Sequence, residues 1–254
     1  MRIIRAYLNW LWRSVNAHGI HSPFLFACYG HLMGNSAPKF NNREIEAIRK
    51  AFKMNHTSIP QIDLGAGSRK NKGKHIKISD IAHTALKPKR DAERLQKLIS
   101  FLQPNCILEL GTSLGISTLY MAKAAPHAQI HTIEGNPYIR KEAQKLFQDK
   151  NQIHSHEGDF DKVLQHILPD LQPDIWFIDG NHTREATIRY FEMAMQHAQK
   201  DICLIFDDIY WSKEMEEAWN YIINSNHSSL SLDLFHLGIV FKKAGLTKEH
   251  YYIR

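Results

Sequence analysis

The clearest pattern in the chain is an alternation, over residues 90–224, of short apolar runs with segments whose apolar positions recur at helical spacing. The apolar runs predict strands at Cys106–Leu110, Gln129–Ile133, Gln152–His156, Asp174–Ile178 and Ile202–Phe206. The helical spacing predicts helices at Asp91–Leu102, Ile116–Ala125, Pro137–Gln148, Phe160–Leu168, Glu185–Gln199 and Lys213–Asn224. Short, very apolar strands that alternate with helices are typical of a doubly wound, mostly parallel α/β sheet.

The two ends of the chain depart from this alternation. Leu230–Phe235 and Ile239–Lys242 predict an antiparallel hairpin at the C-terminal end. Residues 2–52 predict helical pieces, among them Phe24–Met33 and a helix that begins near Asn42. We therefore divide the chain into an N-terminal helical cap with a basic loop, residues 1–89, and an α/β domain, residues 90–254.

The N-terminal stretch, residues 1–22, looks briefly like a signal peptide, but we interpret it as an amphipathic helix. Arg5, Asn9 and Arg13 interrupt its apolar run, so it does not match a signal peptide. Such an amphipathic helix either packs on the domain or lies on a membrane surface. We expect packing.

A glycine-containing segment at Ile62–Ser68 has a sequence similar to that of the loop that follows a nucleotide-binding strand. Its context does not fit, because Pro60 argues against a central strand and residues 69–74 lack apolar helical periodicity. We expect a mobile loop that closes over a site, followed by a short helix that starts near Ser79.

Composition places the chain among ordinary globular proteins. Its 254 residues are 43% hydrophobic and 23% charged, and no apolar run approaches the roughly 18–20 residues that span a bilayer. The three cysteines, at 28, 106 and 203, are too scattered for a disulfide framework or a zinc site. We expect a cytoplasmic protein.

The net charge of +6 has a local source. Eight basic residues and one acid, Asp80, lie between positions 69 and 90; the basic residues are Arg69, Lys70, Lys72, Lys74, Lys77, Lys87, Lys89 and Arg90. Such a cluster attracts phosphates or other anions, or it is a solvated loop followed by a basic helix start.

The stretch Cys106–Met121 reads as a buried strand, a glycine turn and a helix start, where an α/β protein usually holds a nucleotide-like ligand. Glu134 ends the next strand, 25 residues after Glu109, which is a suitable place for a carboxylate that accepts from two ribose hydroxyls. Ser113 stands where a dinucleotide motif has its second glycine, and this argues against a pyrophosphate ligand.

Five short motifs carry a resemblance to a known family: Glu109–Gly115, Ile133–Asn136, Gly158-Asp159, Phe177–His182 and Phe206–Asp208. With the final hairpin, they make about two-thirds of the chain resemble the class I S-adenosylmethionine-dependent methyltransferases. Within that class the chain is most similar to the catechol O-methyltransferase-like branch and its bacterial relatives. The resemblance implies S-adenosylmethionine as cofactor and a small-molecule acceptor, methylated at oxygen.

The resemblance also implies a cofactor-binding set. Glu109 would accept from the amino group of the cofactor, directly or through water, and Asp159 from its adenine amino group, although Asp159 also fits a helix N-cap. The full predicted set is Glu109, Gly111, Thr112, Ser113, Gly115, Ser117, Glu134, Gly135, Asp159 and Asp179.

For catalysis, the resemblance points to the ends of the fourth and fifth strands. In the catechol-type branch, an Asp matching Asp179 and a later Asp-Asn pair hold a divalent cation. Here that pair is Asp207-Asp208, so Asp179, Asp207 and Asp208 are the candidate ligands for Mg²⁺ or another hard cation. His182 stands where the branch commonly has lysine, and the alternative is that Asp179 or His182 is a general base.

Several alternatives stay open. Tyr210 and Trp211 either line an aromatic acceptor pocket or pack in the core. The basic cluster allows an RNA methyltransferase, although the Asn/Asp-Pro-Pro-aromatic motif of base amino-group methylation is absent. A non-catalytic binding protein that retains the fold is a third reading. The oligomeric state is open, with a homodimer among the options.

Overall fold

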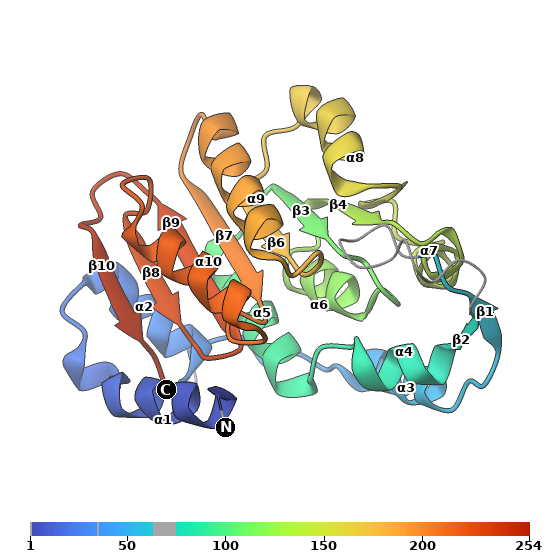
Figure 1. Cartoon of the computed structure of the whole chain (residues 1–254), viewed down its shortest axis with the longest axis horizontal. Coiled ribbons are helices and arrows are strands. Elements are labelled where there is room, and N and C mark those ends of the chain that lie inside the picture. The colour runs from blue at the N-terminus through green and yellow to red at the C-terminus, as the bar shows by residue number, and fades with distance from the viewer. Residues whose placement is uncertain (1, 35, 63–74) are drawn as a thin grey trace. The chain divides into compact units, whose positions relative to one another are not determined.

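The computed structural model describes residues 2–34, 36–62 and 75–254 (Figure 1). Its contacts divide the chain into two compact units. Unit 1 comprises residues 1–36 and 172–254, and unit 2 comprises residues 37–171. The predicted boundary between residues 89 and 90 stays a prediction, but the contacts group the first helices with the C-terminal strands.

Unit 2 contains three parallel strands, which are β3 (Cys106–Leu110), β4 (Gln129–Glu134) and β5 (Ile153–Glu157). Helices follow each strand in turn: α6 (Ile116–Ala124), α7 (Pro137–Gln144) and α8 (Phe160–Ile167), with a 3₁₀ turn at Leu168–Asp170. Ile107–Leu110 of β3 are all buried. A strand covered on both faces is mostly apolar, and Cys106, Ile107, Leu108 and Leu110 gave that signal in the sequence, with the buried Glu109 as the exception.

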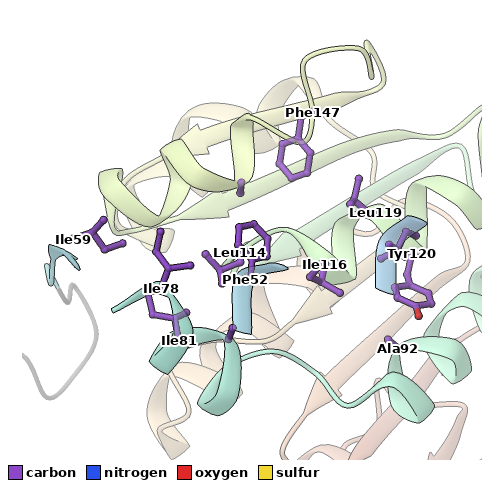
Figure 2. Close-up of a cluster of buried hydrophobic side chains, with 13 residues drawn as sticks. Phe52, Ile59, Ile78, Ile81, Ala92, Leu114, Ile116, Leu119, Tyr120 and Phe147 are labelled. Atoms are coloured by element: carbon purple, nitrogen blue, oxygen red, sulfur yellow. The ribbon is translucent and has the colours of Figure 1, made fainter. Parts of the chain in front are cut away.

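The N-terminal part of unit 2 supplies α3 (Arg43–Lys53), α4 (Ile78–Thr84) and α5 (Lys89–Leu102). It also forms a two-stranded antiparallel ladder of β1 (Ser58–Pro60) and β2 (His75–Lys77), which sequence analysis missed. Figure 2 shows apolar side chains from these elements and from α6 in one buried cluster, including Phe52, Ile78 and Ile116. This cluster holds the N-terminal helices of unit 2 beside the first strand-to-helix turn.

Unit 1 contains the parallel pair β6 (Ile175–Ile178) and β7 (Ile202–Asp207). Strand β9 (Leu237–Lys242) pairs antiparallel with both β7 and β8 (Leu230–Asp233). Strand β10 (Glu249–Tyr252), which was not predicted, pairs parallel with β8. Helices α9 (Arg184–His197) and α10 (Lys213–Asn224) pack on one another (Figure 1).

The N-terminal segment of unit 1 forms α1 (Arg2–Arg13), a 3₁₀ turn at Ala17–Gly19 and α2 (Pro23–Leu32). α1 contacts β10, and Val15 forms a bridge with Ile253. Trp10 is the one buried residue of α1. The expected packing therefore holds for the Trp10 side of the helix, whereas other apolar residues of α1 are exposed.

The predicted fold class is confirmed. The five predicted parallel strands and their helices are present within a few residues of their expected bounds, and the C-terminal hairpin is antiparallel as expected. The predicted loop at 63–74 lies outside the described residues. Among the helices that the structure describes, none is both long and apolar enough to cross a membrane.

Candidate cofactor site and catalytic residues

The turn between β3 and α6 has three residues with positive φ. They are Gly111 (107°), Ser113 (48°) and Gly115 (78°). A Cβ on Gly115 would lie 2.7 Å from Cζ of Phe147, so both conformation and space require glycine there. Ser113 adopts the left-handed conformation without being glycine, which costs about 1–2 kcal/mol and marks a specialised turn.

Glu134 at the end of β4 is bonded to this turn. Its Oε2 accepts from the backbone N–H of Ser113 at 2.9 Å, and its Oε1 accepts from the backbone N–H of Asn136 at 2.9 Å. These two donors orient the carboxylate at the carboxyl edge of the parallel strands, where folds of this kind bind ligands.

Asn136 was not among the predicted site residues. Its side-chain oxygen accepts from the N–H groups of Tyr138 and Ile139, which makes it the N-cap of α7, and its amide nitrogen donates to the carbonyl of Pro60 at 3.2 Å. The Asn-Pro pair before a helix was a usable capping signal. The contact with Pro60 carried no signal in the sequence.

Glu109 is completely buried, and its carboxylate accepts three hydroxyl hydrogen bonds. Ser117 and Thr118 donate at 2.6 Å and Thr132 donates at 2.7 Å. Burial raises the pKa of Glu109 to about 7, and the three hydroxyl donors oppose this rise. Thr118 and Thr132 were not predicted. The predicted contact between Glu109 and the cofactor's amino group stays a prediction, whereas its role in joining β3, β4 and α6 is evident.

Three further residues of the predicted cofactor set, Thr112, Gly135 and Asp159, also lie in unit 2. Thr112 is buried and its hydroxyl is 2.6 Å from that of Thr132, while its N–H, like that of Gly111, donates to the carbonyl of Ile133. Asp159 is the N-cap of α8 and accepts from the N–H of Lys162 at 3.2 Å. Gly135 follows Glu134 directly. The capping interpretation of Asp159 is confirmed, and it does not conflict with a role in binding adenine.

Asp179 and His182 lie in unit 1, in the loop between β6 and α9. The Nε2 of His182 is 3.8 Å from Oδ1 of Asp179, and both side chains are partly exposed. Asn181 between them has a φ of 52°, and its side-chain oxygen is buried without a hydrogen-bond partner among the described residues. The carboxylate can orient the imidazole or stabilise its protonated form.

The predicted metal-binding role of Asp179, Asp207 and Asp208 stays a prediction. Across residues 2–34, 36–62 and 75–254, no group of three or more His, Cys, Asp or Glu side chains is placed to hold a metal ion. Asp207 is the buried last residue of β7, and Asp208 follows it with a φ of 54°.

Tyr210 belongs to the core of unit 1. Its hydroxyl donates to the buried carboxylate of Asp233 at 2.7 Å, and its ring stacks on Phe235 at 5.1 Å between centroids. Burial raises the pKa of Asp233 to about 6, against the donors Tyr210 and Trp219. The packing interpretation is therefore confirmed for Tyr210, whereas Trp211 is exposed.

Three of the four described members of the basic cluster, Lys77, Lys89 and Arg90, are exposed. Lys89 lies 3.7 Å from Glu93, and Arg90 lies 3.4 Å from Asp91. Lys87 is buried, and its carbonyl accepts from Arg49. Residues 69–74 of the cluster lie outside the described residues, and the nucleic-acid alternative stays a prediction.

Residues 108–209 match a family model described as a methyltransferase domain. The match begins inside β3 and ends just after β7, so it includes the glycine turn, Glu134 and the Asp179–His182 loop. This stretch therefore resembles a methyltransferase domain, which agrees with the reaction type that the motifs predict.

Three solved proteins, two of them described as methyltransferases, share the fold at low sequence identity. An O-methyltransferase from Bacillus cereus in complex with SAH has a TM-score of 0.53 and 19% identity, over 62% of this chain and 82% of that one. A Podospora anserina methyltransferase bound to SAH reaches a TM-score of 0.55 at 14% identity, over 81% of this chain and 98% of that one. The cofactor-bound protein Rv0187 from MTB gives a TM-score of 0.56 at 16% identity, over 84% and 94% of the two chains.

Proposed function

We propose that this methyltransferase transfers the methyl group of S-adenosylmethionine to a hydroxyl oxygen of a small-molecule acceptor. The resemblance of residues 108–209 to a methyltransferase domain and the fold shared with a Podospora anserina methyltransferase support the reaction type. The Bacillus cereus neighbour, an O-methyltransferase in complex with SAH, supports the choice of cofactor and of oxygen.

The observation that carries the proposal is the placement of Glu134. Backbone N–H groups of Ser113 and Asn136 hold its two carboxylate oxygens at the carboxyl end of β4. A carboxylate oriented in this way before the ligand arrives is a suitable acceptor for the two vicinal hydroxyls of a ribose.

The other residues of the turn fit the same ligand. The side-chain oxygen of Ser113 is buried without a partner in the described part of the chain, which is expected of a group that bonds to a ligand. The Gly111–Gly115 backbone would lie against the methionine and ribose portions, and Asp159 would receive the adenine amino group. S-adenosylmethionine supplies a methyl group that its sulfonium has already activated.

The protein therefore has to align the acceptor, exclude water and receive one proton. His182 is our candidate for the group that takes the proton of the acceptor hydroxyl, and Asp179, 3.8 Å from its Nε2, is the group that orients the imidazole.

The test is calorimetric titration with S-adenosylhomocysteine of the wild type, Glu134→Ala and Glu157→Ala. Glu157 is a matched control because it occupies the register position beside Glu134 on β5 but pairs with Arg140. Loss of two hydrogen bonds to a charged group should weaken binding about hundredfold or more in Glu134→Ala, whereas Glu157→Ala should match the wild type.

Wild-type protein that does not bind S-adenosylhomocysteine would refute the proposal, and so would Glu134→Ala protein that is folded and binds normally. The acceptor class is tested separately by transfer of a labelled methyl group to catechol and related hydroxyl compounds, with and without a chelator, and to RNA. Transfer to RNA alone would replace the small-molecule acceptor by the nucleic-acid alternative.

A further inference from the structure

Helix α1 presents an unpartnered apolar stripe to solvent. Ile4, Leu8 and Trp12, which we call the α1 stripe, are spaced four residues apart and so lie on one face of the helix. They are 62%, 58% and 85% exposed, respectively. Single exposed apolar residues are ordinary, but a row of three on one helix indicates a surface that binds something.

The opposite side of α1 is held firmly by unit 1. The indole N–H of Trp10 donates to the carbonyl of Asp233 at 3.0 Å, and Arg2 donates to the carbonyls of Tyr210 at 2.8 Å and Trp211 at 2.6 Å. Arg13 donates to the hydroxyl of Tyr252 at 2.7 Å. Since Trp10 and Leu8 are two residues apart, about 200° around the helix, the α1 stripe points away from these contacts.

The charge of α1 indicates what covers the stripe. The helix contains three arginines and no acidic residue. Arg5 lies within about 60° of Leu8 around the helix, so a cation flanks the apolar row. A helix with an apolar row that includes tryptophan, a cationic flank and no acid matches the surface of a bilayer that contains anionic lipids.

A second copy of the chain is a poorer occupant. In a two-fold dimer the same face meets itself, so the cationic flank of one α1 would meet that of the other with no acid on either helix to compensate. We propose that the α1 stripe docks the protein on an anionic phospholipid surface, with Ile4, Leu8 and Trp12 in the interface between headgroups and acyl chains and Arg5 among the headgroups.

The test is flotation of the full chain with vesicles of equimolar phosphatidylglycerol and phosphatidylcholine, compared with vesicles of phosphatidylcholine alone. Wild-type protein should float with the anionic vesicles. Leu8→Glu and Trp12→Glu should each lower the partition coefficient at least about tenfold, and Arg5→Ala about fivefold. Added salt should weaken binding.

Met54→Glu is the matched control, because Met54 is also an exposed apolar residue but lies in unit 2 at the end of α3. It should bind vesicles as the wild type does. Because Leu8 and Trp12 are exposed, their variants should keep the wild-type midpoint of urea unfolding. Light scattering should give the same molar mass in solution for the wild type and for every variant.

Equal flotation with both vesicle types, or anionic binding that survives Leu8→Glu and Trp12→Glu, would overturn the proposal. Loss of a dimer in these variants without lipid binding would assign the stripe to a second copy instead. Catalysis is not involved in any of these measurements, so their outcome is independent of the methyltransferase proposal.

Discussion

Gly115 begins α6 in the cofactor turn, and its replacement by alanine should reveal how strongly packing and conformation together constrain that turn. Its φ is 78°, and a Cβ there would lie 2.7 Å from Cζ and 3.0 Å from Cε1 of Phe147. The left-handed conformation costs an L-residue about 1–2 kcal/mol. Overpacking against a buried ring adds about 1–3 kcal/mol. We expect Gly115→Ala to lower the free energy of unfolding by roughly 2–5 kcal/mol.

Gly245 provides a control for the conformational part alone. Its φ is 79°, nearly that of Gly115, but no atom lies within 4 Å of a Cβ built there. Gly245→Ala should therefore cost only about 1–2 kcal/mol. Both variants lose the same chain entropy from the unfolded state, so the difference between them measures the contact with Phe147.

Urea denaturation of the two single variants, followed by a double-mutant cycle with Phe147→Leu, measures both parts. Shortening the ring should make Gly115→Ala less costly than it is in the wild-type background. Equal costs for Gly115→Ala and Gly245→Ala, or a Gly115→Ala cost that Phe147→Leu does not change, would refute the steric reasoning.

Three further substitutions test the buried carboxylates and the proposed base. Burial raises the pKa of Glu109 from 4.5 to about 7. The free energy of unfolding of the wild type, relative to that of Glu109→Gln, should therefore be greatest below pH 4.5 and should fall as the pH rises through 7. Urea denaturation across this pH range measures the difference. Tyr210→Phe removes a hydrogen bond to Asp233 and should cost about 1–3 kcal/mol in thermal unfolding without changing affinity for S-adenosylhomocysteine. His182→Ala should lower kcat about 10²- to 10⁴-fold at unchanged cofactor affinity, and an unaltered pH–rate profile would contradict its role as base.

The strands and helices of the α/β domain were predictable because their signals are local. Two elements, Cys106–Leu110 and Lys213–Asn224, have the predicted bounds. The strand was recognisable because a buried parallel strand is mostly apolar. The helix was recognisable because Ser212 caps it and it has one apolar face. The glycine turn and Glu134 were also visible, because turn geometry restricts residue types and the acid ends a recognisable strand.

Features that depend on pairing between distant segments were not predictable. Strands β1, β2 and β10 form because they pair with other strands. Their own residues do not have a strong strand pattern. The three hydroxyl donors to Glu109 come from α6 and from the neighbouring strand β4, and motif spacing does not show that these residues meet.

The sequence by itself therefore determined the order of strands and helices, the glycine turn after β3 and the resemblance to methyltransferases. Only the tertiary structure decided that Glu109 is buried among three hydroxyls, one of them from a neighbouring strand, and that α1 binds through Trp10 and leaves Ile4, Leu8 and Trp12 exposed. Periodicity reports that a helix has an apolar face. Which apolar residues are covered depends on the surfaces that meet, and these come from parts of the chain more than 200 residues apart.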